Sequence, residues 1–301
     1  MPNFLVQALP TGSLDIIGDV HGEFQALLQL IENLGYEPDG SHPENRHLIF
    51  VGDYCDRGPD SPAVIDYLKS LITNKKAKGI LGNHEINLLI DDAKDGSGWF
   101  FEERYRSDLR NYSPFKRVKP ENRDEIKEFL RTLPIVLERD DLRIVHAAWS
   151  NPAIDTLRAV KSDDFLDYFF ECEHKADNYA EKKGILDKYL RAKQDWKEKI
   201  EDPHVLMPLL QSYIDYDLLK NEFNPIRLLT SGTEGPAKQA FFAGNRWRFS
   251  DRTAWWDSYL DDVPVVFGHY WRQLFPQPVA KMSKYSLLFK DIDPFSWHGA
   301  K

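Results

Sequence analysis

The chain has 301 residues, of which 42% are hydrophobic and 13% aromatic, so it can fill the core of a folded globular protein. Its formal net charge of -9 excludes bulk electrostatic binding to nucleic acid or to an anionic membrane. The two cysteines, Cys55 and Cys172, lie far apart in sequence, which excludes a disulfide framework and favours a reducing compartment.

The sequence gives no indication of a membrane location. No window approaches the roughly 18 uninterrupted apolar residues of a membrane span. The opening segment MPNFLVQALPTGSLDIIGDV lacks the basic start and the apolar stretch of a signal peptide. We therefore expect a cytoplasmic protein that does not bind membranes.

The first third of the chain alternates short apolar runs with amphipathic segments. The pairs are LDIIG and EFQALLQLIENLG, HLIFVG and PAVIDYLKSLI, and AKGILG and NHEINLLI. This rhythm predicts an α/β fold in which helices cover a parallel or mixed sheet.

The rest of the chain is less regular. Residues 91–134 form a polar insertion in which DEIKEFLRTLP predicts a short helix, and IVLER with LRIVHAAW predicts a hairpin. Residues 151–224 are charged and helical in period, whereas AFFAGNRWRFSD and VPVVFGHYW predict strands. We expect one domain over residues 1–301, with a helical insertion at about 151–224 that covers the functional site.

Polar side chains follow five of the apolar runs. Because ligands bind beyond the carboxyl ends of strands in α/β sheets, we expect these side chains to converge. Two Asp, one Asn and three His are too many for one tetrahedral ion, but they suit two divalent ions of higher coordination. The six candidate metal ligands are Asp19, His21, Asp53, Asn83, His146 and His269.

The same segments carry a family resemblance. GDVHG, GDYCDRG, GNHE, the later His of RIVHAAW and the GH of VVFGHYW, in this order, resemble the calcineurin-like metallophosphoesterases. Within this family, the DRG and NHE motifs are most similar to those of the phosphoprotein phosphatase branch and its bacterial relatives, which include diadenosine tetraphosphatases. The resemblance runs from about Asp15 to His269 and implies an αββα sandwich of mixed sheets.

The resemblance also implies a role for each ligand. Asp19, His21 and Asp53 would hold one metal ion. Asp53 would bridge to a second ion, which Asn83, His146 and His269 would complete. We expect Mn²⁺, with Fe or Zn²⁺ as alternatives. Two such ions can lower the pKa of a bridging water so that it attacks phosphorus.

Four further residues are implied to act on the substrate. His84 would protonate the leaving group, and Asp56 would orient it; such a proton transfer contributes on the order of 10²–10⁴-fold. Arg57 would clamp the phosphoryl oxygens, because a guanidinium matches two oxygens in a way that Lys does not. Among the arginines of RWRFSDRTAWW, we select Arg252 as a second phosphate-binding residue.

Each residue also has a structural interpretation. Asp19 and Asp53 could be helix N-caps, a single His is commonly a core residue, and Asp56 with Arg57 could be a surface ion pair. These interpretations do not explain the whole set, which favours a metal site. Cys55 is not a phosphatase nucleophile, because Ser61 stands where that chemistry needs Arg.

Three functions remain open. The first is a phosphomonoesterase of the serine/threonine phosphatase type, and the second is a dinucleoside polyphosphate hydrolase. Leu81 before Gly82 favours the second, because protein-specific members of the family have Arg there. The third is a non-catalytic scaffold. The expected substrates are accordingly a phosphorylated small molecule, a nucleotide or a phosphoprotein.

Four tryptophans lie near the last motif. They could stack against a base, although core packing is their usual role. The four are Trp247, Trp255, Trp256 and Trp271.

Overall fold

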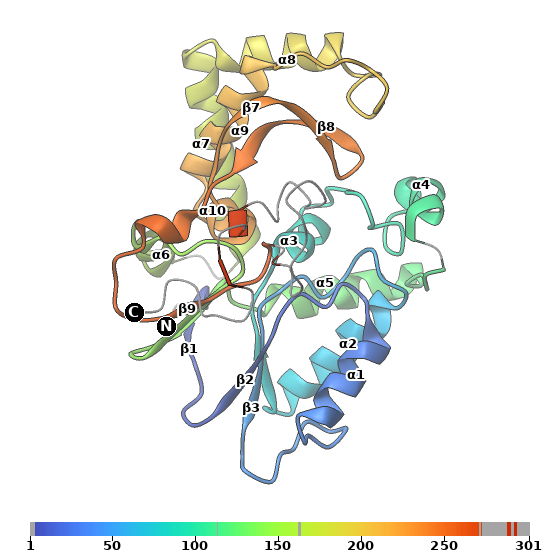
Figure 1. Ribbon diagram of the computed structural model, residues 1–301, viewed down its shortest axis with the longest axis vertical. Helices are drawn as coiled ribbons and strands as arrows, with labels where there is room; N and C mark the ends of the chain where they lie inside the picture. The colour runs from blue at the N-terminus through green and yellow to red at the C-terminus, as the bar shows by residue number, and fades with distance from the viewer. Residues whose placement is uncertain are drawn as a thin grey trace.

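Two β-sheets pack against each other in the lower half of the molecule (Figure 1). The computed structural model describes residues 4–112, 114–161, 164–270, 272, 288–289 and 292–293. The first sheet has the order β2-β3-β4 and the second the order β1-β5-β6-β9. The strands are β1 (Val6–Ala8), β2 (Leu14–Ile17), β3 (His47–Phe50), β4 (Ala77–Gly79), β5 (Val136–Arg139), β6 (Leu142–Val145) and β9 (Val265–Val266).

The first sheet is parallel throughout, as the alternating pattern predicts. Its strands connect through α1 (Phe24–Asn33) and α2 (Ser61–Thr73). Successive residues of a strand point to opposite faces. Phe50 accordingly belongs to the cluster that includes the buried residues of these helices, whereas Ile49 belongs to the cluster shared with the second sheet. One parallel and one mixed sheet with helices on their outer faces confirm the predicted α/β fold class.

The second sheet is mixed. β5 and β6 form the predicted antiparallel hairpin, and β9 pairs with β6 in parallel. β1 was not predicted, because its three residues lie between Pro2 and Pro10 and are too few to show a period. It is nevertheless fixed by parallel pairing to β5, with Val6 opposite Val136. The helix α6 (Asn151–Arg158) packs on the outer side of this sheet.

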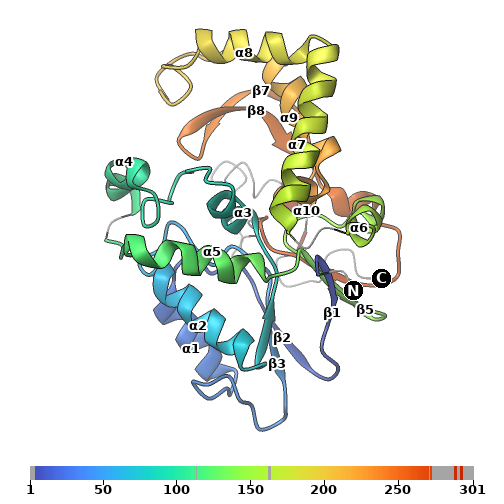
Figure 2. The same ribbon diagram turned by 180° about the vertical axis from the view of Figure 1, so that it is seen from behind.

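The charged segment forms a helical group above the sheets, seen from both sides in Figures 1 and 2. It consists of α7 (Phe165–Lys182), α8 (Ile185–Asp195) and α9 (Gln211–Phe223). Helices α8 and α9 share a separate core around Tyr213 and Ile214, whereas Phe165 and Phe169 of α7 pack into the main core. The predicted helical insertion ends at about Asn224, but a further helix, α10 (Pro225–Ser231), follows it.

A long hairpin adjoins this helical group. β7 (Glu234–Ala243) and β8 (Arg246–Arg252) pair in antiparallel, and β7 begins earlier than AFFAG predicts. The hairpin lies between α8 above it and α3 (Asn83–Leu89) below it (Figure 1).

The polar insertion is more ordered than the sequence predicts. It contains α4 (Glu102–Tyr112) as well as η1 (Pro120–Asn122) and the predicted α5 (Arg123–Arg131). In α4 only Asp108 is buried, so the helix has no apolar face to produce a helical period.

Two of the tryptophans pack in the core. Trp255 and Trp256 lie in η2 (Trp255–Ser258) and are each 7% exposed. The ring of Trp256 stacks on Phe267 at a centroid distance of 5.4 Å. Trp247 packs with the helical group, and Trp271 lies outside the described residues. Core packing is therefore confirmed for Trp255 and Trp256.

The described helices include none with the length and apolar character needed to cross a bilayer.

A charged network fixes the helical group to the rest of the molecule. Glu173 of α7 accepts two hydrogen bonds from Arg227 of α10, at 2.7 and 2.9 Å. It also accepts one from Asn224 at 2.8 Å and lies 3.2 Å from the ammonium of Lys220. Burial opposes ionisation of Glu173, but the bond to Arg227 and the neighbouring charges lower the pKa of its carboxyl.

We predict that Glu173→Ala lowers the free energy of unfolding by roughly 2 kcal/mol, because it removes both oxygens that the guanidinium of Arg227 binds, although Lys220 keeps its pair with Asp177. Urea denaturation measures this change. Glu171→Ala is the matched control on the same helix, since Glu171 makes only an exposed pair with Lys175 at 2.6 Å. The control should change stability by less than about 0.5 kcal/mol. Equal losses in the two variants would contradict the role of the network.

Candidate active site

The ends of five strands bring the predicted polar side chains together. Asp19 follows β2, Asp53 follows β3 and Asn83 begins the helix after β4. His146 follows β6 directly, and His269 follows β9. The sheets thus deliver residues that are up to 250 positions apart to one place.

The carboxylate of Asp53 lies at the centre of this site. Its Oδ2 atom is 3.3 Å from His146 Nε2, 3.8 Å from His21 Nε2 and 3.9 Å from His84 Nε2. Asp53 is only 2% exposed. Two groups of possible ligand atoms share it: His21, Asp53 and His84 form one group, and Asp53, His146 and His269 form the other. The arrangement has the donors for two neighbouring cations with one bridging carboxylate.

Three buried polar atoms at the site support a cation-binding role. Among the described residues, Asn83 Oδ1, His146 Nε2 and His269 Nε2 have no hydrogen-bond partner. Leaving such atoms unpaired in the interior costs free energy, so native proteins seldom do it. A divalent cation would satisfy all three, and the donor set suits Mn²⁺, Fe or Zn²⁺.

The outer nitrogens of two imidazoles are already engaged. His146 Nδ1 lies 2.7 Å from the carbonyl of Val51, and His21 Nδ1 lies 2.9 Å from the carbonyl of Cys55. A backbone carbonyl accepts from the protonated ring nitrogen and thereby leaves Nε2 as the ligand atom. Both rings are therefore oriented with Nδ1 at a backbone carbonyl and Nε2 on the side of Asp53.

Asp19 lies in the same region but is held differently. Its two carboxylate oxygens accept from the backbone N–H of His269 at 3.2 and 3.1 Å. Burial raises the pKa of this carboxyl, and the nearby charge of Asp53 adds to that effect. The structure thus places Asp19 at the junction of the first and last site segments.

The buried charges shift one another strongly. Burial opposes ionisation of Asp53, but the imidazoles of His146 and His84 outweigh it and hold the pKa of this carboxyl well below its usual range. Burial likewise opposes protonation of His146, yet Asp53 raises its pKa to about 9. Burial lowers the pKa of His21 to about 4 and that of His269 well below its usual range. A bound cation would replace the proton that His146 otherwise carries.

A second carboxylate orients His84. Asp56 Oδ2 lies 2.5 Å from His84 Nδ1, and Asp56 Oδ1 accepts from Trp99 Nε1 at 2.6 Å. Asp56 is fully buried, so both of its oxygens are fixed by these partners. Trp99 was not among the predicted site residues, because nothing in its local sequence connects it to Asp56.

The two predicted arginines lie beside this centre. Arg57 NH1 is 3.2 Å from His21 Nε2, so its guanidinium points into the site. Arg252 NH1 donates to the carbonyl of His269 at 3.1 Å. The structure thus brings both predicted phosphate-binding arginines next to candidate metal ligands.

The backbone of the site is strained. A positive φ is uncommon for residues other than glycine and persists only where the surroundings enforce it. It occurs here at the five site positions His21 (45°), Asp53 (52°), Asp56 (71°), Arg57 (68°) and His269 (60°).

Glu85 enforces part of this geometry and was missed as a site residue. Its carboxylate accepts from the backbone N–H groups of Asp53 and Tyr54, both at 2.8 Å, and of Gly82 at 3.0 Å. Glu85 is completely buried, and burial raises the pKa of its carboxyl. Glu85 is the last residue of the GNHE motif, but its hydrogen bonds to the backbone of Asp53 and Tyr54 cannot be inferred from the sequence.

Close approach requires glycine next to two of the carboxylates. A Cβ atom on Gly268 would lie 2.1 Å from Asp19 Oδ1, and one on Gly82 would lie 2.3 Å from Asp53 Oδ1. Larger residues at these positions would displace the side chains that define the site.

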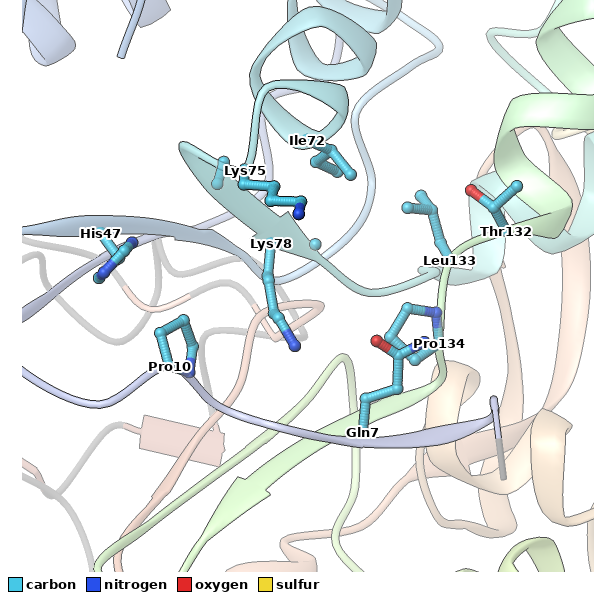
Figure 3. A pocket seen from close by; sticks show the side chains of 11 residues that line it. Gln7, Pro10, His47, Ile72, Lys75, Lys78, Thr132, Leu133 and Pro134 are labelled. Atoms are coloured by element: carbon cyan, nitrogen blue, oxygen red, sulfur yellow. The ribbon is translucent and has the colours of Figure 1, made fainter. Parts of the chain in front are cut away.

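A separate pocket of about 410 Å³ lies between β4 and the segment that follows β1 (Figure 3). Lys75, Lys78 and Leu133 are among its lining residues. None of the predicted site residues lines it, so this pocket is distinct from the candidate active site.

Comparison with known proteins agrees with this geometry. A family model described as calcineurin-like phosphoesterase matches residues 13–270. Over 73 residues the chain is 51% identical to the asymmetrical bis(5'-nucleosyl)-tetraphosphatase PrpE of Halalkalibacterium halodurans and 48% identical to that of Anoxybacillus flavithermus. Each match covers 23% of this chain and only 30% of the relative.

A solved structure of a protein serine/threonine phosphatase from Saccharomyces cerevisiae is also similar, at 16% identity with a TM-score of 0.35. The match covers 53% of this chain and 47% of that chain.

We predict that Asp53→Asn lowers the affinity for Mn²⁺ by at least about 100-fold, because it removes the carboxylate shared by both ligand groups. Titration calorimetry and the Mn²⁺-dependent rise in melting temperature measure the loss without reference to turnover. Asp155→Asn is the control, since that exposed carboxylate pairs only with Arg158 within its helix. If Asp53→Asn binds Mn²⁺ as tightly as the wild type, Asp53 is not a shared metal ligand.

Proposed function

The chain belongs to the calcineurin-like phosphoesterase family, and on this basis we propose that it is a metal-dependent hydrolase whose substrates are dinucleoside polyphosphates. The observation that carries the proposal is the buried carboxylate of Asp53, which is shared by two groups of candidate ligands. The substrate class follows from the relatives named tetraphosphatases, which match about a quarter of the chain.

Six residues would hold the cofactor. In this proposal Asp19, His21 and Asp53 hold one divalent cation, and Asp53 bridges to a second cation held by Asn83, His146 and His269. When bound, such cations supply Lewis acidity that polarises the phosphoryl group and activates a water. The unpartnered atoms of Asn83, His146 and His269 support the second set.

His84 is proposed to give a proton to the leaving oxygen. Burial opposes protonation of this imidazole, but the carboxylates of Asp53 and Asp56 outweigh it and raise its pKa, so the acid form is available near neutral pH. Asp56, itself fixed by Trp99, holds the ring with Nε2 directed toward Asp53.

Arg57 and Arg252 are proposed to bind the phosphoryl oxygens. Both guanidinium groups lie beside candidate ligands, and a planar fork can hold two oxygens of a phosphoryl group. Their contacts orient the substrate and compensate charge that develops during the reaction.

Leu81 supports the choice of a nucleotide substrate. This residue is completely buried and its backbone N–H bonds to the carbonyl of Pro134 at 2.9 Å. It therefore offers no cation to a phosphoprotein at the position where protein-specific members have Arg. Hydrolysis of phosphoserine or phosphothreonine is the alternative function, and the DRG and NHE motifs are compatible with it.

The helical group and the hairpin are proposed to select the substrate, since they lie above the helix that carries Asn83 and His84 (Figure 1). We also place the activity in a reducing compartment such as the cytoplasm, because both cysteines are free and buried.

The substrate class can be tested with p-nitrophenyl phosphate, a phosphoserine peptide and diadenosine tetraphosphate, each with Mn²⁺ and with a chelator. We expect hydrolysis only with the metal. We expect kcat/KM for diadenosine tetraphosphate to exceed that for the peptide by at least about tenfold. Preference for the peptide would instead identify a protein phosphatase. Mn²⁺ binding without any turnover would indicate a scaffold.

The role of His84 can be tested with two monoesters that differ in leaving group. We predict that His84→Asn slows phenyl phosphate hydrolysis by about 10²–10⁴-fold, because phenolate needs a proton. p-Nitrophenolate leaves readily without one, so its ester should be affected much less. His174→Asn, on an exposed position of α7, is the control. Equal effects on both esters would show that His84 is not the acid.

A further inference from the structure

Strand β8 carries a row of arginines on one side. Trp247 and Phe249 pack into the core of the helical group with Tyr213. Because side chains alternate along a strand, Arg246 and Arg248 project from the opposite side. Ser250 and Arg252 continue the same row toward the base of the hairpin.

Both ends of this row are tied to the active site. At the base, Arg252 NH1 bonds to the carbonyl of His269. At the tip, Asn245 Nδ2 donates to Asp95 Oδ1 at 2.5 Å. The next residue in that loop, Gly96, accepts from the backbone N–H of Arg57 at 3.0 Å. The row therefore runs from Arg252 toward the loop whose Gly96 binds the backbone of Arg57.

A further cation, Lys94, lies near the tip of the row, because it precedes Asp95, which accepts a hydrogen bond from Asn245 next to Arg246. Burial lowers the pKa of Lys94, and the neighbouring guanidinium groups of Arg246 and Arg248 lower it further, although Asp92 at 2.6 Å opposes this effect. Nε of Arg246 is buried and, within the described part of the chain, has no hydrogen-bond partner. Lys94 is thus already paired with Asp92, whereas the buried Nε atom of Arg246 is a donor that an anionic ligand could use.

Carboxylates border the row and limit what it can bind. Ser250 donates to Glu234 at 2.5 Å, and Asp217 interacts electrostatically with Glu234, Arg246 and Arg248. A ligand with a single charge would gain little in competition with these carboxylates. A chain of several phosphates can contact more than one of the cations at the same time, which offsets the effect of these carboxylates.

We propose that Arg246, Arg248 and Lys94 bind the distal phosphates of a polyphosphate chain whose reacting phosphate lies at Asp53. The inference rests on the proposed function and extends it to residues that would set substrate chain length. Alternate residues of a strand are about 6.6 Å apart, so the row can follow an extended anion. Arginine suits this role because each guanidinium can hold two phosphate oxygens.

Calorimetric titration of the Mn²⁺-loaded protein with tripolyphosphate and with inorganic phosphate tests this proposal. We expect the double variant Arg246→Ala, Arg248→Ala to bind tripolyphosphate at least about tenfold more weakly, with a change of less than about threefold for phosphate. Arg246→Lys keeps the charge and should give an intermediate affinity. In hydrolysis, kcat/KM should fall at least about tenfold more for diadenosine tetraphosphate than for p-nitrophenyl phosphate.

The control is Arg191→Ala, which also removes an arginine side chain. Arg191 is exposed on α8, and the hairpin separates α8 from α3 (Figure 1). It should leave tripolyphosphate affinity unchanged. Equal affinity in the wild type and the double variant, or a parallel loss for phosphate, would overturn the proposal. If arginine-dependent tripolyphosphate binding persists but the wild type cleaves no dinucleotide, the proposed function fails while the binding site stands.

Discussion

The burial of one carboxylate governs the rest of this structure. Asp53 lies out of water among imidazoles from separate segments, and its charge is tolerable because it lies beside His146 and His84, whose pKa values are raised. The backbone accepts a left-handed conformation to put it there, and Glu85 binds the N–H groups on both sides of that distortion. Asp56 is a second buried carboxylate, and its contact with Nδ1 fixes the ring of His84. Two buried charges thus determine the geometry of the site.

The sequence contained enough to place the central sheet and most of the site. Apolar runs of strand length and the residues that follow them identify Asp53 and His146, because strand ends converge in this class of fold. Trp99 and Glu85 were missed for a physical reason: they act through hydrogen bonds to groups that are distant in sequence, Trp99 on Asp56 and Glu85 on the backbone of Asp53 and Tyr54. Helix α4 was missed because it buries almost nothing, and β1 because three residues cannot show a period.

Helices α8 and α9 have a small core of their own, whereas α7 packs Phe165 and Phe169 into the main core of the molecule. Glu173 joins α7 to α10, and the hairpin tip reaches the loop after α3 through Asn245. This division separates two tasks. The sheets hold the reacting groups rigidly, whereas the overlying hairpin can vary its side chains without disturbing Asp53. Loops and hairpins on a rigid scaffold are where substrate preference commonly resides.

The contact between Asp19 and His269 has a consequence for biosynthesis. The backbone N–H of His269 bonds to a carboxylate that lies 250 positions earlier, and β9 reaches the sheet only by pairing with β6. A nascent chain on the ribosome can form the first parallel strands early, since domains fold as they emerge. It cannot close this bond until residue 269 has left the ribosome. A shorter polypeptide therefore lacks the contact that joins the first of the candidate ligands to the last.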